Sequence, residues 1–119
     1  MEYQDSEDHI KRVFRIFPGA VLGVKRRVGK TTALLQLIHE QYSGMATLYS
    51  PTQRQSERAG ERYREMYPED QLPRFIVDAK EARGYDNPIL VDEWWFVRKP
   101  EQRELMGTRR VIARIGTEV

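Results

Sequence analysis

The sequence predicts an α/β fold in which a parallel-rich central sheet is flanked by helices. Short apolar runs of strand length alternate along the chain with amphipathic stretches of helical length. The runs are nearly continuous in apolar residues, which is typical of strands buried on both faces. The length of 119 residues corresponds to one domain, so residues 1–119 are expected to form a single unit.

Composition excludes several classes of protein. The chain has no cysteine, which rules out disulfides and cysteine-based metal sites or catalysis. No apolar run approaches the length of a membrane span, and the polar start Met1–Asp5 does not resemble a signal peptide, so no membrane partner is expected. The net charge of +2 is too small to indicate nucleic-acid binding by itself.

The chain begins with a polar segment, residues 1–9, which is expected to be flexible. Ile10–Phe17 alternates loosely between apolar and polar residues, so it fits either an edge strand or a short helix. Pro18-Gly19 is a turn signal. The continuous apolar run Ala20–Val24 is then expected to be a buried strand.

The next segments predict two helices separated by a strand. Thr31–Tyr42 has a wide apolar arc at helical spacing, with Gly44 in the left-handed position that ends a helix. Met45–Tyr49 is a strand, and Gln53–Tyr67 is a helix that Pro68 ends. Oppositely charged residues three positions apart on this helix favour a salt-bridged solvated face over an arginine stripe for DNA: Arg54/Glu57, Arg58/Glu61 and Arg62/Glu65.

The second half of the chain contains three further strand patterns. Phe75–Val77 is a short strand, and Asp78–Tyr85 is a loop or one helical turn. Pro88–Asp92 is an apolar strand that ends in an acid. Pro100–Met106 is a short helix, and Arg110–Ile115 is the last strand, which runs into Gly116-Thr117.

The stretch between the first strand and the first helix carries the clearest chemical signal. A helix N-terminus attracts phosphate, because its backbone N–H groups are unpaired and carry partial positive charge. Gly29 lets the backbone approach phosphates, Lys30 can reach the β- and γ-phosphates, and the Thr31 hydroxyl can bind Mg²⁺. The usual phosphate-binding loop motif, G-x-x-x-x-G-K-[ST], begins with a glycine at the position where this chain has Val24. The stretch is expected to bind a nucleotide through Lys25, Arg26, Arg27, Val28, Gly29, Lys30, Thr31 and Thr32.

A second motif supplies what the first one lacks. The apolar strand before Asp92 and Glu93 places two carboxylates at a strand end. Asp92 is expected to hold Mg²⁺ opposite Thr31, and Glu93 is the candidate general base for water attack on the γ-phosphate. Two acids at a strand end can also be ordinary loop solvation. Paired with the Gly-Lys-Thr helix start, they predict an Mg²⁺-dependent ATPase with ATP as its substrate.

These residues resemble a known family. Arg26–Thr32 is similar to the arginine-bearing P-loop of viral terminase large subunits, which are the DNA-packaging motors of tailed phages. Three further segments resemble motifs of this family and come in the same order along the chain: Tyr49–Gln53, Ala82–Tyr85 and the strand Ile89–Glu93. Ile115–Thr117 resembles its coupling motif, in which a hydroxyl at a strand end links hydrolysis to movement. The resemblance spans residues 20–118.

The resemblance implies a minimal RecA-like P-loop ATPase, in which the Arg110–Ile115 strand is inserted between Ala20–Val24 and Ile89–Asp92. It implies that Arg26 or Arg27 lies near the γ-phosphate and that Thr117 has a catalytic role. It also implies a homo-oligomeric ring that moves double-stranded DNA into a viral procapsid in the host cytoplasm. Further implied partners are a portal, a small terminase subunit and a separate nuclease, since no nuclease domain is expected in this chain.

Two other functions fit the same motifs. A helicase-like nucleic-acid ATPase would share the phosphate-binding stretch and the acidic pair, while a regulatory module could bind nucleotide without hydrolysing it. Trp94-Trp95-Phe96 favours a core or subunit contact over base stacking on DNA. Candidates for an arginine that reaches a neighbouring subunit's site are Arg98, Arg103, Arg109, Arg110 and Arg114.

Overall fold

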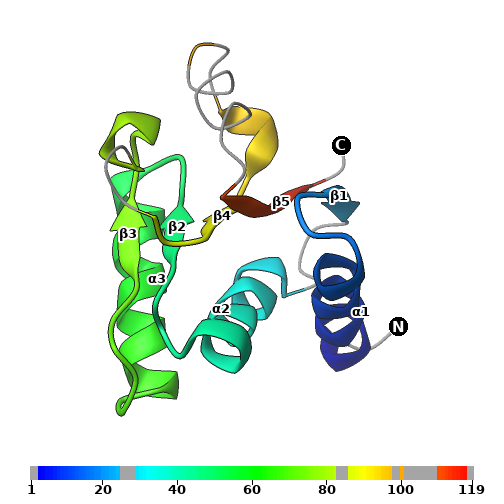
Figure 1. The fold of residues 1–119 in the computed structure, drawn as a ribbon, viewed down its shortest axis with the longest axis horizontal. Coiled ribbons are helices and arrows are strands. Elements are labelled where there is room, and N and C mark those ends of the chain that lie inside the picture. The colour runs from blue at the N-terminus through cyan, green and yellow to red at the C-terminus, as the bar shows by residue number, and fades with distance from the viewer. Residues whose placement is uncertain (1–2, 25–28, 83–85, 98–99, 101–109, 118–119) are drawn as a thin grey trace.

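Five parallel strands form one sheet in the order β1-β5-β4-β2-β3. The computed structural model describes residues 3–24, 29–82, 86–97, 100 and 110–117 (Figure 1). The strands are β1 Val21–Val24, β2 Thr47–Tyr49, β3 Arg74–Ile76, β4 Ile89–Val91 and β5 Val111–Thr117. The predicted parallel sheet is therefore confirmed, and the last strand does lie between the first strand and the acidic one.

Three α-helices cover one face of this sheet: α1 Tyr3–Ile16, α2 Lys30–Tyr42 and α3 Gln53–Met66 (Figure 1). Their buried side chains pack with Leu48, Leu90, Ala113 and Ile115 of the strands. Alternate strand residues, which point to the opposite face, pack instead with two 3₁₀ turns, η1 Ala79–Ala82 and η2 Trp94–Phe96. In the described part of the chain, α-helices therefore flank the sheet on one face only.

The first helix, α1, begins at Tyr3, within the segment that was expected to be flexible. Ile10 and Phe14 lie one helical turn apart and are 1% and 4% exposed against the α2 side of the core. Lys11 binds Glu40 of α2 at 3.0 Å. Ile10 and Phe14 point to the same side because the backbone between them is helical. The polar residues before Ile10 continue that helix toward the N-terminus. Ile10–Phe17, which fitted either an edge strand or a short helix, is therefore helical as far as Ile16.

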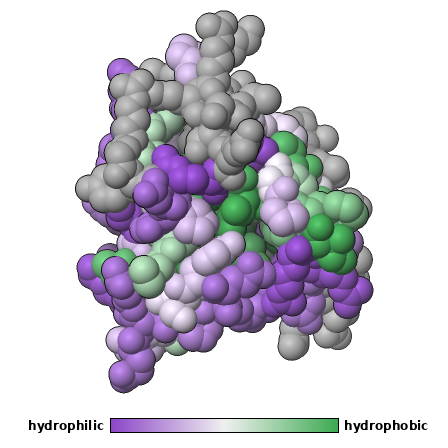
Figure 2. Space-filling model, viewed as in Figure 1, coloured by the Kyte–Doolittle hydropathy of each residue, from purple (hydrophilic) through white to green (hydrophobic). Residues whose placement is uncertain are grey.

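β1 is an edge strand in the described sheet, which corrects the expectation that Ala20–Val24 is buried. It pairs with β5 on one side, and Val21 is 47% exposed. The neighbouring Ile16 and Phe17 are exposed as well, and the hydrophobic surface on the right of Figure 2 covers this junction of α1 and β1. The continuous apolar sequence therefore predicted a strand correctly, but it did not reveal that this strand pairs with one neighbouring strand and not two in the described sheet.

The remaining boundaries agree with the sequence to within two residues, and α2 ends as expected. Gly44 has φ 93°, and Ser43 before it also has positive φ, 51°. An added Cβ on Gly44 would lie 1.7 Å from the carbonyl oxygen of Gln71, so only glycine fits there. The expected helix at Pro100–Met106 lies almost wholly outside the described residues.

Candidate functional site

The carboxyl ends of β1, β4 and β5 meet at one edge of the sheet. β5 lies between the other two, and its last residue, Thr117, is in register with Val24 of β1. Asp92 follows β4 directly, and its backbone N–H donates to the carbonyl of Tyr49 on β2 at 2.9 Å. Chain segments far apart in sequence therefore bring the two predicted motifs together at the edge where parallel sheets bind ligands.

Lys30 and Thr31, the first residues of α2, both contact Asp92. The Thr31 hydroxyl donates to Asp92 Oδ2 at 2.7 Å, and Lys30 Nζ lies 3.8 Å from Asp92 Oδ1. Asp92 is 4% exposed. Burial raises the pKa of Asp92, and the Lys30 charge and the Thr31 hydrogen bond offset part of that effect. The predicted pairing of Thr31 with Asp92 is thus present in the geometry.

Glu93 lies at the centre of the cluster. Its Oε1 forms an ion pair with Lys30 Nζ and accepts a hydrogen bond from the Thr117 hydroxyl at 3.3 Å. Its Oε2 is buried without a hydrogen-bond partner in the described structure. The backbone of Glu93 has φ 52°, in the left-handed region that non-glycine residues rarely adopt, and Asp92 Oδ1 accepts its N–H at 2.9 Å. Such strain at a buried acid is typical of functional sites.

The charges of the described residues at this site do not balance. Among these residues one cation, Lys30, faces two buried carboxylates, and one carboxylate oxygen has no hydrogen-bond partner. Mg²⁺ takes oxygen ligands and is commonly held by one or two carboxylates together with substrate phosphates. Within the described residues, no group of three or more acidic, histidine or cysteine side chains is arranged as a metal cage. The hydroxyl of Thr31 and the carboxylate of Asp92 are oxygen ligands of the kind that Mg²⁺ takes.

Gly29 begins α2 in the left-handed conformation, with φ 76° and ψ 31°, and no side chain caps the helix. The carboxylate of Glu7 on α1 lies directly beside it, since an added Cβ on Gly29 would be 2.5 Å from Glu7 Oε1. The left-handed conformation therefore favours glycine at position 29, whereas the flexible Glu7 side chain can move away from an added Cβ. Sequence reasoning missed Glu7, because it belongs to a segment expected to be flexible and no local motif marks it.

Several predicted residues lie elsewhere or outside the described chain. Lys25, Arg26, Arg27 and Val28 fall on residues 25–28, which the structure does not describe. Thr32 is described and is 8% exposed on the first turn of α2, so its role in nucleotide binding stays a prediction.

Two of the arginines considered for a neighbouring site are bound within their own chain. Arg110 donates to the carbonyl of Ala82 at 3.0 Å. Arg114 donates to the carbonyl of Gly19, and its guanidinium lies 5.2 Å from the ring centre of Trp94. These contacts argue against both as arginines supplied to another subunit. Arg98, Arg103 and Arg109 lie outside the described residues.

The aromatic residues after Glu93 have different surroundings. Trp94 is buried in the core of the second sheet face, and Trp95 is 48% exposed. The Trp95 indole covers Gly116 of β5, where an added Cβ would lie 2.3 Å from its Nε1. The expected core contact is confirmed for Trp94, and Trp95 stays half-exposed beside the acidic cluster.

Comparison with protein-family models, curated proteins and solved structures finds no match for this chain. None of the helices in the described residues has the length and apolar character needed to cross a membrane.

Proposed function

We propose that this protein is an Mg²⁺-dependent ATPase of the RecA-like P-loop kind. The observation that carries the proposal is the convergence of Lys30 and Thr31, at the start of α2, on Asp92 and Glu93, at the end of β4. Neither a solvated helix start nor a solvated acidic loop accounts for it, since all four side chains meet in a largely buried cluster. A cation, a hydroxyl, a metal-binding carboxylate and a second carboxylate are the groups that phosphoryl transfer to water requires.

Each residue of the cluster has a distinct part in the proposed reaction. Lys30 binds the β- and γ-phosphates, and Thr31 with Asp92 holds Mg²⁺, which neutralises charge on the phosphates. Glu93 accepts a proton from the attacking water. Thr117 orients Glu93 through its hydrogen bond to Oε1. Arg26 or Arg27 is expected to stabilise the charge that develops on the γ-phosphate.

The Lys30–Glu93 ion pair adds a constraint to this assignment. The Lys30 ammonium group has three N–H donors, so a bound phosphate would share its charge with Glu93. Movement of Lys30 toward a phosphate is therefore expected to weaken its hold on Glu93, which leaves the carboxylate freer to act as a base. The same ion pair also supports the alternative of a regulatory module that binds nucleotide without hydrolysing it, if Glu93 stays neutralised.

The proposed biological role is that of a motor that packages double-stranded DNA into a viral procapsid. It rests on the resemblance of residues 20–118 to terminase large subunits, and it includes a homo-oligomeric ring in the host cytoplasm at a portal, with a small terminase subunit and a separate nuclease as further partners. Stimulation of ATP turnover by double-stranded DNA with procapsids favours packaging, whereas strand separation favours a helicase. A ring in which arginines act in trans predicts turnover that rises with protein concentration, by up to about 10³–10⁵.

Three variants test the enzymatic proposal by nucleotide titration beside single-turnover hydrolysis. Lys30→Ala should weaken ATP binding and turnover together, because Lys30 contacts phosphate before and during the reaction. Glu93→Gln should keep or tighten ATP binding and lower turnover by roughly 10²–10⁴. Asp92→Asn should lose Mg²⁺-dependent binding. Hydrolysis by Glu93→Gln at the parent rate would exclude Glu93 as the base, and no binding of ATP by the parent protein would refute the proposal.

A further inference from the structure

The exposed face of α3 carries charges of both signs that form no ion pair with another residue of the described structure. Its exposed charged residues on this face are Arg54, Glu57, Arg58, Glu61, Arg62 and Glu65. The ion pairs expected between residues three positions apart do not form, since no residue of α3 belongs to any ion pair within 4.0 Å in the described structure. A salt-bridged solvated face is therefore not what α3 presents.

The order of these charges is unfavourable for α3 alone. Arg54 lies in the first turn, where the helix dipole is positive, and that turn has no acidic residue. Glu65 lies in the last turn, where the dipole is negative, although Arg64 beside it has the favourable sign. Arginine placed before glutamate is also the weaker order for pairs along a helix. The isolated helix thus gains little from its own charges.

A second, antiparallel copy of the helix reverses this situation. We propose that α3 is a self-complementary interface on which two copies of this chain associate about a two-fold axis through the middle of the helix. α3 spans Gln53–Met66, so an antiparallel copy centred on its midpoint sets opposite charges at the same height. The matched pairs are Arg54 with the partner's Glu65, Arg58 with the partner's Glu61, and Arg62 with the partner's Glu57. By symmetry each pair occurs twice.

The spacing of the residues puts the charges where two helices meet. Arg54, Arg58, Glu61 and Glu65 follow one another at intervals of four, three and four residues, which is the spacing of the contact stripe between two packed helices. Glu57 and Arg62 flank that stripe. Antiparallel packing also brings the negative end of the partner helix beside Arg54. A nucleic-acid phosphate backbone would pair with the arginines but would meet the interleaved glutamates as like charges, so a second copy is the better match.

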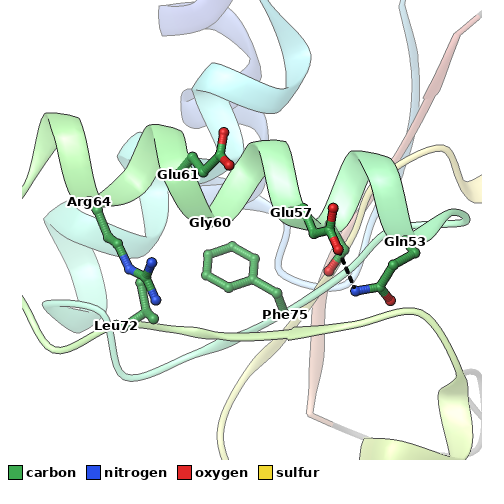
Figure 3. Close-up of a pocket in the computed structure, with 8 residues that line it drawn as sticks. Gln53, Glu57, Gly60, Glu61, Arg64, Leu72 and Phe75 are labelled. Atoms are coloured by element: carbon green, nitrogen blue, oxygen red, sulfur yellow. Dashed lines mark hydrogen bonds between the residues drawn. The ribbon is translucent and has the colours of Figure 1, made fainter.

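The surface around α3 has room for such a partner. A groove of about 700 Å³ between α2 and α3 is lined by Arg58, Arg62 and Met66, and by Gln36 of α2. A second groove of about 280 Å³ separates α3 from Leu72 and Phe75 (Figure 3). α3 is therefore a ridge between two grooves, the shape that lets two helices pack side by side. The contact stripe contains no apolar residue, so the expected dimer is weak. Salt should weaken it further, because salt screens the attraction between exposed charges.

Sedimentation velocity over a range of protein concentrations, at low and at high salt, tests the interface. The parent protein should dimerise at high concentration and low salt, and should return to monomer as salt is raised. Arg58→Glu should abolish the dimer, because each new carboxylate would face Glu61 of the other copy. The double variant Arg58→Glu/Glu61→Arg should restore it, since the pair is reversed on both copies. Circular dichroism checks that the total helix content of each variant matches that of the parent protein.

Arg64→Glu is the matched control on the same helix. Arg64 extends toward Leu72, away from the contact stripe (Figure 3), so this change should leave the dimer intact. The proposal is overturned by a parent protein that stays monomeric at every concentration, by a dimer that survives Arg58→Glu, or by a double variant that fails to recover. None of these measurements depends on ATP binding, so the interface and the proposed ATPase activity can fail separately.

Discussion

Among the described residues, Lys30 is the one cation that contacts the buried acids Asp92 and Glu93, and Lys30→Met should destabilise the protein strongly even without any substrate. The side chains of Lys30, Asp92 and Glu93 are 18%, 6% and 10% exposed. At the 3.8 Å separation of Lys30 from Asp92, one ion pair is worth about 4 kcal/mol at an effective dielectric constant of roughly 20. Removing one partner from a buried pair costs about 3–5 kcal/mol, because the remaining charge stays buried.

The acids can relieve part of this cost by binding a proton. Burial already raises the pKa of Asp92, and the loss of Lys30 raises it further. A carboxyl whose pKa is higher in the folded than in the unfolded state makes the folded protein less stable as pH rises through that interval. The loss caused by Lys30→Met should therefore be about 3 kcal/mol at pH 7, and should shrink as pH falls toward the ordinary Asp value of 3.8.

Guanidinium denaturation of the parent and the variant at pH 7 and pH 5 measures this effect. Lys80→Met is the control, since Lys80 is exposed on η1 and belongs to no ion pair in the described structure. Adding Glu93→Gln to Lys30→Met should recover part of the lost stability, because one of the two uncompensated charges is removed. A loss for Lys30→Met that equals the Lys80→Met loss would show that the cluster does not form in solution.

Three further changes probe other parts of the fold. Gly116→Ala should displace the Trp95 indole, which lies 2.3 Å from the added Cβ, and should cost about 1–3 kcal/mol with a red-shifted tryptophan emission; unchanged emission would contradict that contact. Tyr63→Phe should cost about 1.5–3 kcal/mol in denaturation, because Tyr63 is buried and donates to the Asp70 carboxylate at 2.6 Å. Burial would raise the pKa of Glu40, but its ion pairs with basic residues of α1 lower that pKa below 4.5. The parent protein should therefore be more stable than Glu40→Gln by about 0.5–1 kcal/mol at neutral pH. This difference should vanish as pH falls below 4.5, because Glu40 then becomes protonated. A stability difference that does not shrink between pH 7 and pH 3 would refute the last assignment.

The sequence alone was sufficient for the elements whose signals are local. Helical spacing of apolar residues, Pro68 after α3 and Gly44 after α2 placed both helices to within a residue or so, because a helix depends on contacts three and four residues apart. The sequence also predicted that Lys30, Thr31, Asp92 and Glu93 belong to one site, and the folded chain does bring these four side chains together. Their roles in binding phosphate and metal stay predictions. The position of β5 between β1 and β4 came from the order of the motifs and the family they resemble.

Tertiary structure decided what depends on distant neighbours. Polar residues 3–9 have no helical signal of their own, and they are helical because Ile10 and Phe14 bury one face of α1 in the core beside α2. β1 is as apolar as an interior strand, yet its place at the sheet edge follows from the pairing of β4 with β5 and not from its composition. The ion pair of Lys30 with Glu93 joins residues 63 positions apart, and the contact of Glu7 with Gly29 joins two separate helices. A local pattern sets which backbone conformation is favoured, but only the folded sheet sets which charges share one low-dielectric site.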